Sequence, residues 1–203
     1  MPTTTDSKRP AGPPAYPLVA ILIAVLLLGV GAFLWLNGEV AGPAVGGAFT
    51  LENSNGQTVT DRTFRGKYML VYFGYTYCPD VCPTTLIAVA DALDRLGKKA
   101  DELAPIFITV DPKRDTPSVM REYTAAFTPR LIGLTGSDAE IAAVAKEYHV
   151  YYAENRTGPG PNDYSMDHSS ILYLMGPDGR FIAPLRTDST GAVIASELSK
   201  LMS

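Results

Sequence analysis

Apolar and polar positions alternate in blocks along the chain, and the longest apolar block lies near the N-terminus. Residues 18–36 (LVAILIAVLLLGVGAFLWL) carry no charged side chain. A helix of this length spans about 28 Å, which is close to the roughly 30 Å hydrocarbon core of a bilayer. Tyr16 and Trp35 lie at its two ends, where aromatic rings favour the headgroup region. The pattern predicts a transmembrane anchor in preference to a cleaved signal peptide, whose apolar core is shorter.

The charges around this block predict its orientation. Lys8 and Arg9 precede it, whereas Glu39 is the only charge that follows closely. Basic residues favour the cytoplasmic side, so residues 1–17 are predicted to form a cytoplasmic tail and the chain beyond the anchor to be exported. Residues 37–48 (NGEVAGPAVGGA) are small and rich in glycine, which predicts a flexible tether. We expect the periplasmic side of a bacterial inner membrane in preference to the mitochondrial inner membrane.

Residues 49–203 have the pattern of one α/β domain. The segments 49–51 and 57–60 flank Asn55-Gly56, which is a strong two-residue hairpin signal. Residues 68–74 (YMLVYFG) are nearly all apolar, as is typical of a strand buried on both faces. Further strands are predicted at 105–110 and 130–134, and helices at 83–97, 116–127 and 137–148.

The C-terminal part of this pattern predicts an antiparallel end to the sheet. A polar loop is predicted first, and then residues 170–175 and 180–184 form a hairpin around Gly176-Pro-Asp-Gly179. A short helix closes the chain. Strand–helix–strand units followed by a hairpin and a helix are typical of a thioredoxin-like α/β sandwich. We therefore predict this fold for residues 49–203, with an N-terminal β-hairpin and one N-terminal transmembrane helix as its tether.

Charge and composition narrow the range of expected partners and of side chains available for chemistry. The formal net charge is −4, and the chain contains no run of basic residues, which makes nucleic acid an unexpected partner. Only two cysteines and two histidines occur in 203 residues. Thiol or metal chemistry must therefore use very few side chains.

Both cysteines lie in the stretch YFGYTYCPDVCPTTL, residues 72–86. Cys78 is predicted in the loop that leaves the first parallel strand, and Cys82 at the N-terminus of the next helix. Ligands collect at the carboxyl ends of parallel strands, and a helix N-terminus favours a thiolate placed there. A structural disulfide would close only a very short loop and contribute roughly 2 kcal/mol. The pair therefore indicates chemistry in preference to stabilisation.

Two kinds of chemistry fit this pair. The first is thiol–disulfide exchange, although thioredoxin-type redox cysteines have two intervening residues and this pair has three. The second is metal binding. Two thiolates with one imidazole suit Cu(I), while structural zinc usually takes four protein ligands. His168, in the segment 163–170 (DYSMDHSS), is the candidate third ligand, and Asp167 is a candidate to orient its ring. His149 is interpreted as a solvated residue at a helix C-terminus.

Three further charged residues are weaker candidates. Asp80, between the cysteines, is interpreted equally well as a turn residue or as a group that tunes the thiol pKa or docks a partner. The segment 111–117 (DPKRDTP) follows the second parallel strand and should border the same edge. Thr116-Pro117 is explained as the start of a helix, which leaves Asp111 and Arg114 as candidates for contact with a partner.

These stretches resemble the Sco/SenC family of copper chaperones, which are used in cytochrome c oxidase assembly. The resemblance is carried by YFGYTYCPDVCP (72–83), PIFITVDPKRDTP (105–117), LIGLTGS (131–137) and DYSMDHSSILYLMGPDGRF (163–181). It implies a membrane-tethered domain that binds copper through Cys78, Cys82 and His168. Cu(I) is the expected oxidation state, and binding of Cu(II) is left open. Many members have histidine before the first cysteine, where this chain has Tyr77. That departure makes His168 harder to replace.

The sequence favours one function and leaves two alternatives open. The favoured hypothesis is a copper metallochaperone, not an enzyme, that delivers copper to cytochrome c oxidase subunit II or prepares its binuclear copper site. One alternative is a thiol–disulfide oxidoreductase that reduces the cysteines of that subunit, and the other is a copper or redox sensor. Other copper chaperones or thiol reductants are expected partners, in addition to the membrane.

Overall fold

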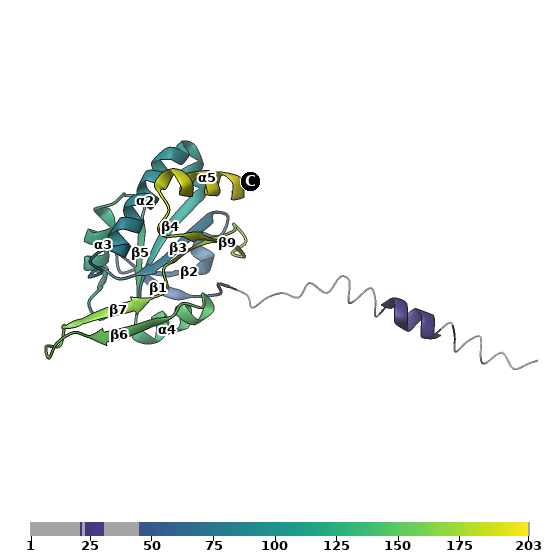
Figure 1. The fold of residues 1–203 in the computed structure, drawn as a ribbon, viewed down its shortest axis with the longest axis horizontal. Coiled ribbons are helices and arrows are strands. Elements are labelled where there is room, and N and C mark those ends of the chain that lie inside the picture. The colour runs from purple at the N-terminus through teal and green to yellow at the C-terminus, as the bar shows by residue number, and fades with distance from the viewer. Residues whose placement is uncertain (1–20, 22, 31–44, 203) are drawn as a thin grey trace, which may run out of the picture. The chain divides into compact units, whose positions relative to one another are not determined.

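The computed structural model describes residues 21, 23–30 and 45–202 (Figure 1). The chain divides into two units, residues 1–42 and 43–203, and the second unit carries the α/β fold. The predicted tail (1–17) and most of the tether (37–48) lie outside the described residues, as do the two ends of the predicted anchor. The anchor residues that are described, 21 and 23–30, are helical. Among the described residues, the structure contains no helix with the length and apolar character needed to span a membrane.

A seven-stranded mixed sheet forms the centre of the second unit, with the strand order β2-β1-β5-β4-β3-β8-β9. The central strands β3, β4 and β5 are parallel, and β8 pairs antiparallel with β3. The strands are β1 (Thr50–Asn53), β2 (Thr58–Thr60), β3 (Tyr68–Gly74), β4 (Leu103–Thr109), β5 (Ile132–Thr135), β8 (Ile171–Met175) and β9 (Phe181–Arg186). The predicted α/β sandwich with its N-terminal hairpin is confirmed.

Helices cover both faces of this sheet. They are α2 (Val81–Leu96), α3 (Pro117–Ala125), α4 (Asp138–Glu147) and α5 (Gly191–Leu201), with the 3₁₀ helices η1 (Asp61–Phe64) and η2 (Gly97–Glu102). Figure 1 shows α5 beside α2, and these two helices pack against each other. The layers place α2, α3 and α5 on one face and α4 on the other.

The alternation of side chains along β3 explains this layering. Tyr72 points toward α2, where its hydroxyl donates to Cys82 Sγ, and its ring packs beside Phe107. Phe73 points to the opposite face and packs against Tyr148, which follows α4. Tyr72 and Phe73 are both almost completely buried. Because successive strand residues face opposite sides, a strand between two helical layers must be apolar at every position.

Several predicted boundaries differ from the structure by one or two residues, among them the starts of α2 and β4. Helix α2 begins at Val81, with Asp80 as its N-cap residue, and so it starts two residues before the predicted Pro83. Proline is tolerated there because the amide groups of the first helical turn have no intrahelical partner. Strand β4 begins at Leu103, two residues before the predicted Pro105, because Leu103 already pairs with Tyr68 of β3.

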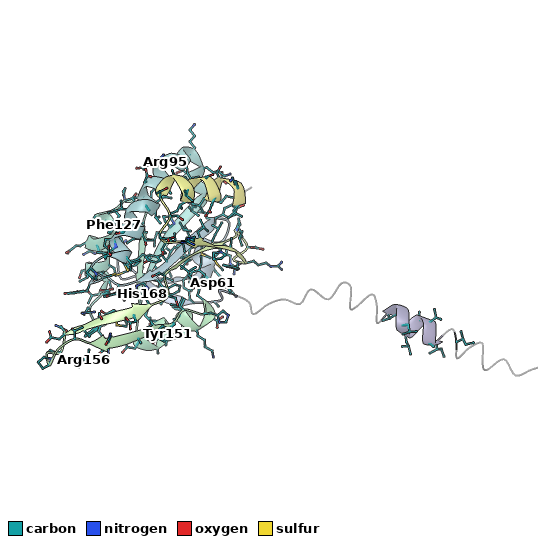
Figure 2. All side chains as sticks on the ribbon, viewed as in Figure 1. Asp61, Arg95, Phe127, Tyr151, Arg156 and His168 are labelled. Carbon is teal, nitrogen blue, oxygen red and sulfur yellow. The ribbon has the colours of Figure 1, made fainter. Side chains whose placement is uncertain are left out.

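The structure also forms a ribbon where the sequence predicts a polar loop. Strands β6 (Tyr152–Arg156) and β7 (Tyr164–His168) pair antiparallel as a separate two-stranded sheet. This β6–β7 ribbon projects away from the main sheet (Figure 1). Figure 2 shows His168 at the end of the ribbon nearest the main sheet and Arg156 toward the opposite end. The ribbon therefore brings its last residue, His168, to the body of the domain.

Candidate metal centre

Cys78 and Cys82 lie where the sequence predicts them, between the end of β3 and the first turn of α2. Hydrogen bonds within its own backbone and to a buried carboxylate fix the loop that carries Cys78. The Cys78 amide donates to the Tyr75 carbonyl at 3.3 Å. The Thr76 amide and hydroxyl both donate to the Asp115 carboxylate, at 3.0 and 2.6 Å. These bonds hold the cysteine loop in one conformation.

Gly74, the last residue of β3, leaves the space that the Cys82 sulfur occupies. A Cβ atom at this position would lie 2.7 Å from Cys82 Sγ and 2.8 Å from a ring carbon of Phe107. Cys82 is 0% exposed, so its sulfur has no room to withdraw toward solvent. Glycine is required here for close approach between the strand and the sulfur.

His168 completes a cluster of three donor atoms. Its Nε2 atom is 3.5 Å from Cys82 Sγ, and one ligand atom from each of Cys78, Cys82 and His168 lies within 4.8 Å of the others. The other ring nitrogen, Nδ1, is 3.1 Å from the carbonyl oxygen of Ser169. With a metal bound, a neutral ring that donates from Nδ1 to this carbonyl would present the Nε2 lone pair to the metal.

The two thiols have opposite pKa shifts. The pKa of Cys78 is lowered to about 4, chiefly because the Cys82 thiol donates to its sulfur, with further hydrogen bonds from His168 and from the backbone at Asp80 and Cys82 that outweigh burial. The pKa of Cys82 is raised by that same bond to the Cys78 thiolate and by burial. The sequence predicted the stabilised thiolate at Cys82. In the structure the stabilised thiolate is at Cys78 instead, chiefly because the Cys82 thiol donates to its sulfur. The Cys82 amide in the first turn of α2 also donates to Cys78 Sγ, at 3.4 Å.

This donor set fits a soft monovalent ion. Metal–sulfur bonds are about 2.3 Å long, so donor atoms within 4.8 Å of one another reach a shared ion with little movement. Two thiolates and one imidazole select Cu(I) over hard cations such as Mg²⁺ or Ca²⁺. Cys78 and His168 line a hollow that opens to solvent beside Pro79, Val81 and Met166. An ion held here is therefore reachable from outside the protein.

The weaker candidates do not all lie where the sequence suggested. Asp80 has an exposed side chain that accepts a hydrogen bond from the Thr84 hydroxyl at 3.3 Å. Asp167 is also exposed, and the partner of His168 Nδ1 is the Ser169 carbonyl instead of the Asp167 carboxylate. Adjacent residues on a strand point to opposite faces, which explains this exchange of partners.

Asp111 and Arg114 form a buried ion pair, with side chains that are 2% and 8% exposed. Both side chains are largely covered, so neither is an open surface group, and their contact with a partner stays a prediction. The ion pair contacts the β6–β7 ribbon, where the Tyr164 hydroxyl donates to Asp111 Oδ1 at 2.8 Å.

Sequence reasoning missed three residues that contact the donor side chains or anchor the cysteine loop. The Tyr72 hydroxyl donates to Cys82 Sγ at 3.6 Å, and the rings of Tyr72 and Tyr75 stand edge-on to the His168 imidazole. Asp115 anchors the cysteine loop through Thr76. The alternation of β3 offers one signal for Tyr72, because it shares a strand face with Gly74 at the end that carries the cysteine loop.

Comparisons with known proteins show the family of this chain. A model of the SCO1/SenC family matches residues 38–203. Protein sco1 of Schizosaccharomyces pombe is 44% identical over 155 residues, covering 75% of this chain, which spans only 59% of that relative's length. The copper-bound structure of Bradyrhizobium japonicum ScoI is 46% identical, with a TM-score of 0.72, and the match covers 78% of this chain and 99% of that one.

A third match carries information on redox behaviour. BsSco, described as a member of the Sco family of cytochrome c oxidase assembly proteins with a disulfide switch, is 25% identical with a TM-score of 0.60. That match covers 78% of this chain and 94% of BsSco. The family match spans most of this chain and includes all three donor residues. The chain therefore belongs to the SCO1/SenC family.

Proposed function

We propose that this protein is a copper metallochaperone that carries one copper ion between Cys78, Cys82 and His168 and serves the assembly of cytochrome c oxidase. The observation that carries the proposal is the meeting of two thiol sulfurs and one imidazole nitrogen within 4.8 Å of one another. Copper is bound in the related ScoI of Bradyrhizobium japonicum, and BsSco belongs to a family of cytochrome c oxidase assembly proteins. Both relatives support the choice of cargo and pathway.

The proposed cargo site combines a deep ligand with two accessible ones. Cys82 is fully buried, whereas Cys78 and His168 line the solvent-open hollow. Cys78 needs no deprotonation near neutral pH, because its pKa is lowered to about 4. Copper binding then displaces the proton of Cys82 and requires a neutral His168. A receptor could exchange its own ligands for Cys78 and His168 first, so we propose transfer to the binuclear copper site of cytochrome c oxidase subunit II.

The proposed setting is an exported domain on a single N-terminal anchor. The uncharged block at residues 18–36 and the preceding Lys8 and Arg9 support an N-terminus in the cytoplasm and a periplasmic domain. A reporter that is active only after export, fused to the C-terminus, should be active in the membrane fraction. A silent reporter, or a shortened product in the supernatant, would contradict the anchor.

A second candidate function is thiol–disulfide exchange on the cysteines of the same oxidase subunit. It is favoured by the low pKa of Cys78 and by the adjacent protonated Cys82. In that reaction the Cys78 thiolate attacks the target disulfide and releases one target thiolate. Cys82, after losing its proton, then attacks Cys78 and releases the second thiolate, so two electrons pass to the target and the domain is left with a disulfide.

Replacement of His168 separates the two functions, because thiol exchange uses no imidazole ligand. His168→Ala should weaken copper binding by about 10–100-fold or more. Thiol exchange with a model disulfide peptide should continue, altered only by the loss of the His168 hydrogen bond that helps to lower the pKa of Cys78. His149→Ala is the matched control, because it removes an exposed imidazole after α4. In a host that depends on its copper oxidase, His168→Ala should fail to restore oxidase activity when copper is limiting. Full restoration would refute the chaperone function and favour exchange.

A further inference from the structure

The guanidinium of Arg114 lies between the two segments that carry the candidate copper ligands. Arg114 itself belongs to the loop between β4 and α3, and its side chain is 8% exposed. Its Nε atom donates to the Asp111 carboxylate, and its Nη1 atom donates to the carbonyl oxygens of Tyr164 at 3.0 Å and Asn162 at 3.4 Å. The Tyr164 hydroxyl returns a bond to Asp111 at 2.8 Å, which closes a ring of contacts. We call Asp111, Arg114 and Tyr164 the Arg114 clamp.

The clamp touches the cysteine loop as well as the β6–β7 ribbon. The guanidinium carbon of Arg114 lies 3.7 Å from the ring centre of Tyr164, on β7, and 4.6 Å from that of Tyr77, which directly precedes Cys78. The Tyr75 ring is 5.8 Å away and stands edge-on to the His168 imidazole. A planar guanidinium can stack on aromatic faces and donate along its edges at the same time.

Other polar connections tie the ribbon to the rest of the domain, and one of them is a hydrogen bond between the Tyr75 side chain and the Met166 backbone on β7. The two strands of the ribbon pair with each other and form a sheet separate from the main one. An ion pair between Lys113 and Glu154 also joins the ribbon to the loop after β4, but the lysine is exposed and the distance is 3.4 Å. Exposed pairs of this type contribute little, whereas a buried guanidinium with charged and carbonyl acceptors holds a fixed geometry.

We propose that Arg114 is a positioning residue for the copper site, which fixes β7 against the cysteine loop and so sets the distance from His168 to the two sulfurs. The inference rests on the proposed function for its copper readout. Arg114 touches none of the three donor atoms, so its effect must pass through His168. A purely stabilising role would weaken copper binding whether or not His168 is present.

Coupling between Arg114 and His168 tests the proposal directly. We would measure Cu(I) affinity of the full-length protein in detergent, by competition with a chromophoric Cu(I) chelator, for Arg114→Met, His168→Ala and the double variant. Arg114→Met should weaken binding by about 10–100-fold when His168 is present. In the His168→Ala background the same change should have less than about a threefold effect, because independent sites add and coupled sites do not. Equal losses in both backgrounds would overturn the proposal.

Two further variants distinguish geometry from charge and from folding. Arg114→Lys keeps the positive charge but loses the planar fork, so it should resemble Arg114→Met; full retention of affinity would show that only the charge matters and would refute the clamp. Should Arg114→Met fail to fold, Tyr164→Phe removes only the hydroxyl bond to Asp111 and should show a smaller loss with the same dependence on His168. Arg95→Met is the matched control, because Arg95 pairs with Asp91 on the exposed face of α2.

A copper-free measurement keeps the inference testable by itself. In the apo protein, Arg114→Met should raise the rate at which diethyl pyrocarbonate modifies His168, because the ribbon is released, while the exposed His149 should react at an unchanged rate. An unchanged His168 rate would refute the positioning role even if copper binds. If wild-type protein binds no copper but His168 becomes more reactive in the variant, the proposed function fails and the positioning role stands.

Discussion

The narrow space at Gly74 leads to a quantitative prediction for Gly74→Ala. The added Cβ would lie 2.7 Å from Cys82 Sγ, whereas ordinary contact begins near 3.4 Å, so the sulfur must move by about 0.7 Å. The new Cβ cannot instead shift away from the sulfur, because a ring carbon of Phe107 would be only 2.8 Å from it. A displacement of this size exceeds the tolerance of about 0.5 Å within which a functional site must be held.

Two quantities should change together in this variant. Overpacking a close-packed interior costs about 1–3 kcal/mol, which corresponds to a fall in Tm of about 2–12 °C for a domain of this size. Cu(I) affinity should fall by at least about tenfold, because Cys82 supplies the deepest of the three donor atoms. The melting temperature is measured by circular dichroism, and copper affinity by competition with a chromophoric chelator at a temperature where both proteins are folded.

Gly133→Ala separates crowding from loss of the site. Its Cβ would lie 3.1 Å from Thr124 and 3.3 Å from Met120, on β5 and away from the cysteines. This control should destabilise the domain to a comparable or smaller extent and leave copper affinity within about twofold of wild type. Wild-type copper affinity in Gly74→Ala, with the domain folded, would refute the reasoning that the sulfur has no room to move.

Three further outcomes are expected. The disulfide form should bind copper weakly, and reduction should restore about one ion per chain, because copper requires thiolates. Copper titration of both forms measures this. Equally tight binding by the two forms would exclude the cysteines as main ligands. Cys82→Ala should raise the pKa of Cys78 above about 4, because the donor thiol that lowers it most is lost; ultraviolet thiolate absorbance against pH follows the shift, and an unchanged titration contradicts this cause. Burial raises the pKa of Asp115 in the folded protein above its value in the unfolded chain. Between these two pKa values the folded state binds more protons than the unfolded chain, so the free energy of unfolding falls as pH rises through that interval. Asp115→Asn should flatten this slope in denaturant unfolding, and an identical slope would exclude Asp115 as its source.

Local sequence signals predicted the elements whose ends depend on neighbouring residues. The helix predicted at 137–148 starts with a capping box between Ser137 and Glu140, in which the Ser137 amide donates to Glu140 Oε2 at 2.8 Å. Strand β3 occupies residues 68–74 as predicted. A central strand buried on both faces is a nearly continuous apolar run, so its ends are readily located in the sequence. The β6–β7 ribbon escaped prediction, since much of it is solvent-exposed and so it lacks the apolar alternation of a half-buried strand.

The sequence by itself determined which atoms are available for chemistry. Two cysteines and two histidines left few choices, and the position of Cys78 and Cys82 between a strand and a helix indicated a site at the carboxyl edge of the sheet. Only the tertiary structure decided which sulfur carries the negative charge, because that depends on the direction of the Cys82 amide and thiol. It also turned Arg114 from a candidate surface residue into a buried contact with the ribbon. Hydrogen bonds and burial depend on distances of a few ångströms between segments far apart in the chain, and such distances exist only once the strands and helices have packed together.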